Sequence, residues 1–198
     1  MKKVILFSTL TEVNTNKITS LLFPEAMKDK SLAFMPSDGI INCKQEYIDQ
    51  WQSIAHRFNA GFAVIDNLSE NTDEEILKLQ SSNILVISGG NTFKLLGNLR
   101  TSGLDKAVLE FTRKDTFVLS GYSAGALVLT PSIEVCNLPK YDSDAAGITD
   151  LTGLQIVDFE IFPHYAPEDE KVFQEYSKKT NLPVKAIADD GFVELSIS

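Results

Sequence analysis

Short runs of apolar residues, rich in β-branched and aromatic side chains, recur along the chain and alternate with amphipathic stretches. Uninterrupted apolar runs of this length are typical of strands that are buried on both faces of a parallel sheet. The sequence therefore predicts buried strands at residues 2–8, 32–36, 61–66, 83–88 and 116–120.

Between these runs, apolar residues recur at the three- and four-residue spacing of a helix face. The clearest example is the helix predicted over residues 44–58, with its apolar face at Tyr47, Ile48, Trp51, Ile54, Ala55 and Phe58. Thr72 and Glu75 have the spacing of a capping box, which predicts that the helix DEEILKLQ begins there. Further helices are predicted at residues 92–99 and 168–178.

The alternation of strands and helices predicts an α/β fold, a three-layer sandwich with a mostly parallel central sheet. Residues 130–153 are polar and rich in turn formers, and we interpret them as a long surface excursion near the site. Strand character returns at residues 154–165, and Asp189-Asp190-Gly191 forms a predicted tight turn between the last two strands. All of these elements are expected in one domain, residues 1–198.

Composition limits the partners that we expect. The 198 residues are 43% hydrophobic, enough for one sizeable core, and the net charge of -9 argues against nucleic acid or an anionic membrane as a partner. The apolar run Val4–Phe7 is too short for a secretory signal and is interpreted as the first strand. Cys43 and Cys136 have no metal-ligand spacing, so we expect two reduced, buried thiols in a cytoplasmic protein.

The segment GYSAG, Gly121–Gly125, carries the strongest chemical signal. It matches the G-x-S-x-G nucleophile elbow and lies between a predicted buried strand and a predicted helix that begins at Ala124. The glycines allow a steep turn, which would expose the hydroxyl of Ser123 at the strand end. The alternative is a tight turn that contains a serine by chance.

A serine nucleophile requires a base, and the chain has two histidines. His56 lies in the predicted helix 44–58 and is interpreted as a surface residue. His164 follows Pro163 at the end of an apolar stretch, so we favour it as the base over a purely structural role. Spacing alone leaves the third, acidic partner open among Asp142, Asp144, Asp158, Glu160, Glu168, Asp169, Asp189, Asp190 and Glu194.

An oxyanion formed by attack on a carbonyl requires backbone N–H donors. The amide of Ala124, directly after the nucleophile, is one candidate. The Gly89-Gly90 turn is the second, because glycine lets backbone amides approach a ligand closely. A nucleotide-phosphate role for this turn is disfavoured, because its spacing matches neither common phosphate-binding motif.

The segments ISGGNTFKLL, GYSAGALVL and FPHY, in this order and spacing, resemble the dipeptidase E family of serine peptidases, which includes aspartyl dipeptidases and is related to cyanophycinases. The resemblance covers nearly the whole chain. It implies a fold like that of class I glutamine amidotransferases, and a triad in the order serine, histidine, acid.

Carried over by position, the resemblance makes Ser123 the nucleophile, His164 the general base and Asp190 the acid. Gly90 and Ala124 would supply the oxyanion amides. Aspartyl dipeptidases have an arginine after the histidine for the substrate's acidic side chain. Here Lys171 is the nearest cation, and we assign it to substrate binding together with Asn91.

The resemblance implies a serine exopeptidase that hydrolyses dipeptides or short peptides through an acyl-enzyme, with a preference for N-terminal aspartate. It implies no metal and no other cofactor. Two alternatives stay open at this stage: a hydrolase of small esters that uses the same elbow, and a non-catalytic protein that binds a small amino-acid-like ligand. The sequence leaves the oligomeric state undetermined.

Overall fold

The computed structural model describes residues 1–27, 30–144 and 146–197. Its centre is a six-stranded sheet with the strand order β3-β2-β4-β5-β1-β8. All neighbours in this sheet are parallel except β8, which runs antiparallel to β1. The strands of this sheet are β1 (Lys2–Phe7), β2 (Ser31–Met35), β3 (Gly61–Val64), β4 (Ile84–Ile87), β5 (Phe117–Tyr122) and β8 (Phe192–Ser196).

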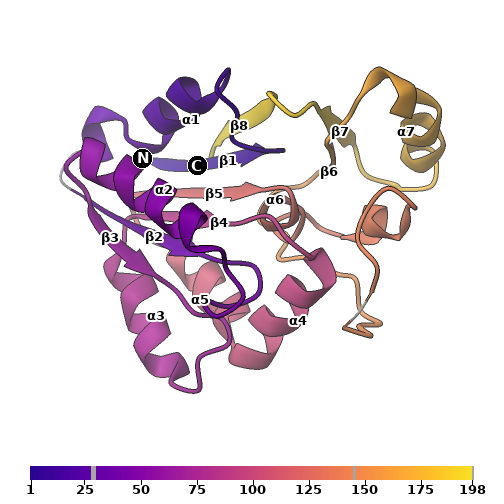
Figure 1. Cartoon of the computed structure of the whole chain (residues 1–198). Coiled ribbons are helices and arrows are strands. Elements are labelled where there is room, and N and C mark those ends of the chain that lie inside the picture. Colours follow the sequence, from indigo (N-terminus) through magenta and orange to yellow (C-terminus); the bar gives the residue numbers. More distant parts are fainter. Residues whose placement is uncertain (28–29, 145, 198) are drawn as a thin grey trace.

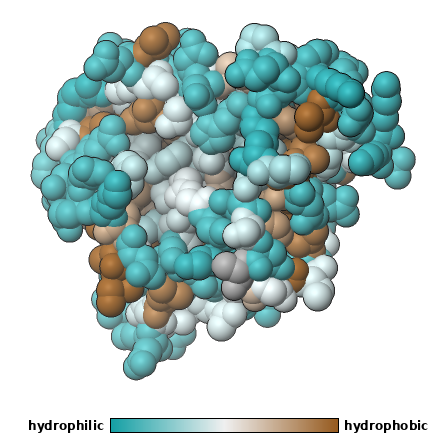
Figure 2. Space-filling model, turned by 45° about the vertical axis from the view of Figure 1, so that its right-hand side comes forward, coloured by the Kyte–Doolittle hydropathy of each residue, from teal (hydrophilic) through white to brown (hydrophobic). Residues whose placement is uncertain are grey.

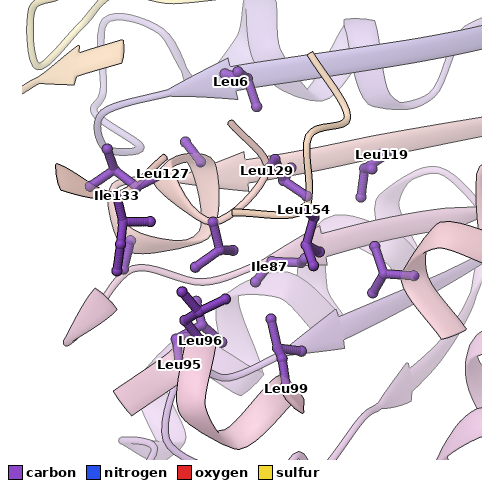
Figure 3. Close-up of a cluster of buried hydrophobic side chains, with 14 of the residues drawn as sticks. Leu6, Ile87, Leu95, Leu96, Leu99, Leu119, Leu127, Leu129, Ile133 and Leu154 are labelled. Carbon is purple, nitrogen blue, oxygen red and sulfur yellow. The ribbon is translucent and has the colours of Figure 1, made fainter. Parts of the chain in front are cut away.

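Helices cover both faces of this sheet, as the α/β pattern predicts. One apolar cluster joins the sheet to α1 (Thr15–Leu22) and α2 (Gln45–Arg57). The other cluster lies on the opposite face and contacts α3, α4, α5 and α6, as Figures 1 and 3 show. The bounds of these four helices are Thr72–Ser81, Thr92–Ser102, Leu104–Phe111 and Ala124–Leu127. The predicted three-layer arrangement is therefore confirmed.

The register of the central strands explains why their sequences are apolar throughout. Alternate side chains of one strand point to opposite faces, and both faces are covered. In β1, Val4 and Leu6 enter one cluster, whereas Ile5 and Phe7 enter the other. Figure 3 shows Leu6 and Leu119 from neighbouring strands together with leucines of α4.

Two of the predicted elements differ from the structure in extent. Within residues 154–165, only β6 (Glu160–Pro163) is a strand. The apolar residues before it are buried without forming a ladder, because Leu154 and Ile156 donate their backbone N–H groups to the carbonyls of Val128 and Leu129. The predicted helix 168–178 is divided into a 3-10 turn, Pro167–Asp169, and α7 (Glu170–Ser177).

The predicted capping box at Thr72 is wrong. The N-cap of α3 is Asn71, and Thr72 is already the first helical residue. The carboxylate of Glu75 instead accepts a hydrogen bond from the amide of Asp66, at 2.9 Å, and pairs with Lys78. Glu75 thus fixes the loop before the helix rather than the helix end itself.

The last strands do not form the hairpin that the sequence suggests. β7 (Val184–Ile187) pairs in parallel with β6 in a separate two-stranded sheet, while β8 joins the central sheet beside β1. Figure 1 shows β6, β7 and α7 beyond the carboxyl ends of β1 and β5. The turn at Asp189 therefore connects two different sheets, and this places it next to the carboxyl end of β1.

Residues 130–153 contain the 3-10 helix Glu134–Asn137 and otherwise little regular structure, as the turn-rich sequence predicts. The segment is anchored at both ends: Ser132 bridges Thr152, and Asp142 accepts hydrogen bonds from Thr92 at the start of α4. Among the residues that the structure describes, no helix is long and apolar enough to cross a membrane.

Candidate active site

The segment Gly121–Gly125 forms a sharp bend between β5 and α6, as the elbow motif predicts. A Cβ atom at Gly121 would lie 2.2 Å from the carbonyl oxygen of Gly125, and one at Gly125 would lie 2.1 Å from that of Ile87. No side chain fits at such distances, so close packing of backbone on backbone requires glycine at both positions. The bend leaves Ser123 at the carboxyl end of the central strand.

Ser123 itself has a strained backbone, with φ of 48° and ψ of -115°. A positive φ in a non-glycine residue costs on the order of 1–3 kcal/mol and persists only where surrounding contacts hold it. Here the Ser123 amide donates to the carbonyl of Phe7, and its carbonyl accepts from the amides of Ala126 and Leu127 in α6, all at 3.0 Å. The neighbouring strand and helix thus hold the serine in an exposed position.

The hydroxyl of Ser123 lies 2.9 Å from Nε2 of His164. His164 follows β6 and also has a positive φ, 55°. Its backbone N–H donates to the hydroxyl of Ser8, at 2.9 Å, and that hydroxyl donates to the carbonyl of Ile187, at 2.8 Å. Ser8 is fully buried at the end of β1, so it joins the small sheet to the large one where the imidazole must be placed.

The acid that contacts the imidazole is Asp189, and the prediction of Asp190 is wrong. Oδ1 of Asp189 lies 2.6 Å from Nδ1 of His164. The amide of Gly191 donates to the carbonyl of Ala188, which makes Asp189 and Asp190 the two central residues of one turn. The buried side chain of Asn14 also donates to the carbonyl of Asp189, at 3.4 Å. These contacts direct the first carboxylate of the turn, not the second, to the histidine.

The imidazole of His164 and the carboxylate of Asp189 differ from those of a buried triad in their exposure. The side chain of Asp189 is 66% exposed and that of His164 is 36% exposed. Solvent weakens the attraction between a carboxylate and an imidazolium at such a position. We therefore expect Asp189 to orient the imidazole and its tautomer more than to stabilise its charge.

A cavity of about 410 Å³ opens beside Ser123 and His164. Its size is at the small end of the range for ligand pockets, which favours a small ligand. Its wall contains the aromatic rings of Tyr47 and Tyr122, and burial raises the pKa of Tyr122 to about 12, so that its phenol is neutral. Figure 2, turned to bring the strand ends forward, shows a pale area of intermediate hydropathy among hydrophilic residues.

The two predicted oxyanion donors lie beside the nucleophile. Ala124 is the next residue in the chain and is buried, and Gly90 lines the cavity together with Ser123. A Cβ atom added to Gly89 would lie 3.2 Å from Cβ of Ser123, so the Gly89-Gly90 turn packs directly against the serine. Within the described residues, neither the Gly90 nor the Ala124 amide donates a backbone hydrogen bond.

The structure does not bring the two predicted substrate-binding residues into the cavity. Asn91 is the N-cap of α4: its side-chain oxygen accepts from the amide of Lys94, and its nitrogen donates to the carbonyl of Ser143. Lys171 lies exposed on α7. Neither is among the residues that line the cavity. His56, interpreted from the sequence as a surface residue, is exposed on α2.

The cavity instead receives charged side chains from the segment between β2 and α2. These are Asp38, which forms an ion pair with Lys94 at 3.0 Å, and Lys44, whose side chain is 72% exposed. Sequence reasoning missed them because the segment has no recognisable motif. It also missed Ser8, although this serine follows a predicted buried strand in the same way as Ser123 does.

The excursion 130–153 reaches the same region from the other side. Nζ of Lys140 donates to the carbonyl of His164, at 2.9 Å, and also contacts the carboxylate of Asp169. The hydroxyl of Tyr141 donates to the carbonyl of Pro163, at 2.8 Å. The segment thus supports the backbone on both sides of the Pro163-His164 peptide.

The cysteines are free, as expected, but only one is buried. Cys136 lies in the core, where burial raises its pKa to about 12. Cys43 is half-buried in the cavity wall, and its pKa is also raised by burial. Both thiols are therefore protonated at neutral pH. The described part of the chain contains no group of three histidine, cysteine or acidic side chains placed to hold a metal ion.

The central sheet is mostly parallel and has helices on both faces, and a strained serine lies at the end of one of its central strands beside a histidine and a carboxylate. These features define the class of α/β proteins with a nucleophile elbow. Within that class, the chain belongs to peptidase family S51, whose model matches residues 4–196. The membership agrees with the resemblance to dipeptidase E and makes this protein a peptidase.

Similar proteins support the same assignment. An uncharacterized peptidase of Pasteurella multocida is 28% identical over 94% of this chain and 90% of its own. An uncharacterized peptidase of Listeria monocytogenes is 27% identical over 81% and 80% of the two chains. Peptidase E of Salmonella newport is 27% identical over 72% of this chain and 59% of its own.

Two solved structures share the fold. A protein of Listeria monocytogenes EGD-e, provisionally named peptidase E, superimposes with a TM-score of 0.77 at 23% identity, and the match covers both chains completely. A peptidase from an acI-B1 Actinobacterium gives a TM-score of 0.68 at 17% identity over 98% of this chain and 83% of its own. The α/β fold with a mostly parallel central sheet is therefore shared with both of these structures.

Proposed function

We propose that this protein is a serine exopeptidase that hydrolyses dipeptides or short peptides. The observation that carries the proposal is the continuous hydrogen-bonded series from Asp189 through His164 to Ser123, at the mouth of a small cavity. A serine hydroxyl beside an imidazole that is oriented by a carboxylate is the arrangement that activates serine for attack on an acyl carbon.

The reaction follows from these positions. Nε2 of His164 accepts the proton as Oγ of Ser123 attacks the scissile carbonyl. The amides of Gly90 and Ala124 donate no backbone hydrogen bond to another described residue, and in this scheme they donate to the oxyanion. His164 then gives the proton to the leaving amine, and water hydrolyses the acyl-enzyme by the same steps in reverse order.

The size and charge of the cavity support a short substrate. A cavity of about 410 Å³ is enough for a small peptide, and its wall includes one acidic and one basic residue, Asp38 and Lys44. A preference for N-terminal aspartate would require a cation in the cavity. Lys44 is in a position to provide it, whereas Lys171 lies outside.

The test is hydrolysis of a dipeptide panel that includes N-terminal aspartate, neutral and basic residues, beside a panel of short acyl esters. Ser123→Ala should abolish turnover and labelling by a fluorophosphonate, a reagent that reacts covalently with activated serines. The matched control is Ser120→Ala, because Ser120 is a buried serine on the same strand whose hydroxyl donates only to the carbonyl of Ile5. It should keep both properties.

Three results would contradict the proposal. Equal dipeptide turnover in Ser123→Ala and the unaltered protein would exclude Ser123 as the nucleophile. Ester turnover without any peptide turnover would identify a small-ester hydrolase. Absence of both turnover and labelling would favour a protein that only binds small ligands.

If the panel shows activity, Lys44→Met should lower kcat/KM for dipeptides with N-terminal aspartate and leave kcat/KM for neutral dipeptides within about twofold.

A further inference from the structure

The peptide unit that joins Gly89 and Gly90 has an unusual support on its carbonyl side. The hydroxyl of Ser88 donates to the carbonyl oxygen of Gly89, at 2.9 Å. The same hydroxyl oxygen accepts the backbone N–H of Ser37, at 2.8 Å. Ser88 is 5% exposed at the carboxyl end of β4, and its own amide donates to the carbonyl of Met35. The hydroxyl of Ser88 therefore binds two backbone groups, one as donor and one as acceptor.

Because the peptide is trans, a bond that holds the carbonyl of Gly89 also affects the N–H of Gly90. The carbonyl of Gly89 and the N–H of Gly90 belong to one rigid plane and point in opposite directions. No peptide bond between described residues is cis. A hydrogen bond that fixes the Gly89 carbonyl therefore also fixes the direction of the Gly90 N–H, the donor assigned above to the oxyanion.

Contacts around Gly90 hold the same peptide from a second direction. Gly90 has φ of 146°, a conformation that favours glycine, and a Cβ atom there would lie 2.0 Å from Oγ of Ser37. Ser37 thus packs against the Cα atom of Gly90 while its amide binds Ser88. Without these contacts, a diglycine segment would sample many conformations, because glycine restricts the backbone least.

The loop that carries Ser37 is itself anchored by a buried amide. The side chain of Asn67, which is 2% exposed, accepts from the amide of Gly39 at 2.8 Å. It also donates to the carbonyls of Pro36 and Ser37, at 3.0 and 3.1 Å. Through this series, the loop after β3 supports the loop after β2, which supports the diglycine turn after β4.

We infer that Ser88 is a positioning residue for catalysis: its hydroxyl orients the Gly90 amide toward the oxyanion by holding the carbonyl of Gly89. Ser88 touches no reacting atom in this role. The inference rests on the proposed function, since an oxyanion donor matters only if Ser123 attacks a carbonyl. It gives a positioning role to Ser88, a residue of the segment ISGGNTFKLL to which the sequence alone assigns no function.

The experiment compares three substitutions at Ser88 by steady-state kinetics on the best dipeptide. Ser88→Ala removes the hydroxyl, and Ser88→Cys keeps a side chain of similar size but with a weak donor. Both should lower kcat by about tenfold to 100-fold, below the full loss of one oxyanion donor, and leave KM within about twofold. Ser88→Thr restores a hydroxyl group and should recover most of kcat.

Ser120→Ala is the matched control, because it also removes one buried serine hydroxyl that binds a backbone carbonyl. It should lower the thermal midpoint about as much as Ser88→Ala does, while kcat stays within about twofold of the unaltered protein. The rate of fluorophosphonate labelling, which also forms negative charge on an oxygen beside Ser123, should fall in Ser88→Ala in parallel with kcat. These readouts separate positioning from a general loss of stability.

Asn67, which holds the loop that carries Ser37, gives a second test with a smaller expected loss of kcat. Asn67→Ala should lower kcat severalfold, less than Ser88→Ala, because it acts on Gly90 only through the Ser37 loop. Asn71→Ala is its control: Asn71 lies in the same connection, but its side chain donates to Glu74 on the surface. A kcat in Ser88→Ala within twofold of the unaltered protein, or an equal loss in Ser120→Ala, would overturn the inference and leave the proposed function intact. Failure of the proposed function has a separate readout: dipeptide turnover in Ser123→Ala would then equal that of the unaltered protein.

Discussion

The nucleophile and its two partners are held in place by different means. Ser123 lies in a bend whose shape is enforced by glycines two residues before and after it, with distances that leave no space for any side chain. His164 and Asp189 instead depend on residues distant in the sequence, among them Ser8, Asn14 and Lys140. The serine side is thus held by close packing of backbone on backbone, whereas the histidine side is held by side chains from separate segments.

Exposure follows the same division. The elbow residues are buried or half-buried against the central sheet, while the carboxylate of Asp189 is 66% exposed on a turn between two sheets. A local, buried bend tolerates few substitutions because backbone packs on backbone. A site assembled from loops loses function in smaller steps as single contacts are removed. The two sides of the site should therefore fail differently when they are altered.

The largest effect is expected at the elbow. Gly125→Ala would place a Cβ atom 2.1 Å from the carbonyl oxygen of Ile87, and it should reduce the free energy of unfolding by at least about 3 kcal/mol. Urea unfolding measures this. Gly97→Ala is the control, because a Cβ atom there meets Ile148 at an ordinary 3.6 Å and alanine favours the helix. A stable Gly125→Ala protein would show that this close backbone packing does not enforce the bend.

The next effect separates the two carboxylates of the turn. Asp189→Asn should lower kcat/KM by about 100-fold, since the amide can no longer hold the imidazole in the tautomer that accepts the serine proton. The loss is expected to be smaller than for a buried acid because solvent reaches this carboxylate. Asp190→Asn should stay within about twofold. Peptidase assays on both variants decide the assignment, and a larger loss at Asp190 would restore the original prediction.

A smaller effect is expected at the junction of the two sheets. Ser8→Ala leaves the backbone N–H of His164 without its partner, and an unsatisfied buried group of this kind costs about 1–3 kcal/mol. We expect a lower thermal midpoint together with a severalfold loss of kcat. Ser120→Ala should lose stability without losing kcat. Unchanged kcat in Ser8→Ala would mean that the imidazole is placed without this contact.

The smallest effect concerns acid stability. The hydrogen bond from Lys140 holds the pKa of Asp169 below its ordinary value, helped by the amide of Ala166. A carboxyl group with a lowered pKa in the folded state stabilises the protein above its unfolded pKa, about 3.9, and this contribution is lost as the pH falls further. Unfolding free energies should therefore decline less steeply below pH about 4 in Lys140→Met. An identical decline in both proteins would exclude this ion pair as a source of acid sensitivity.

Much of the fold was predictable because local pattern and tertiary environment agree. The predicted strands of the central sheet lie within a residue or two of those in the structure, since apolar β-branched runs have few other stable arrangements. The helix 44–58 was predicted almost to its ends. Residues 154–159 were misassigned because burial of Leu154 and Phe159 requires only apolar side chains, not a ladder of backbone hydrogen bonds.

The sequence by itself indicated the elbow at Ser123, because the glycines that allow its steep bend are its chain neighbours, although the carbonyl of Ile87 that excludes a side chain at Gly125 comes from another strand. It also indicated His164 as the base, since so few histidines were available. Only the tertiary structure decided that Asp189 rather than Asp190 meets the imidazole, and that Lys44 rather than Lys171 lines the cavity. These choices depend on how a turn crosses from one sheet to another and on which loops converge. The positions of Asp189 and Lys44 are set by contacts between segments far apart in the chain, and not by their neighbours in the sequence.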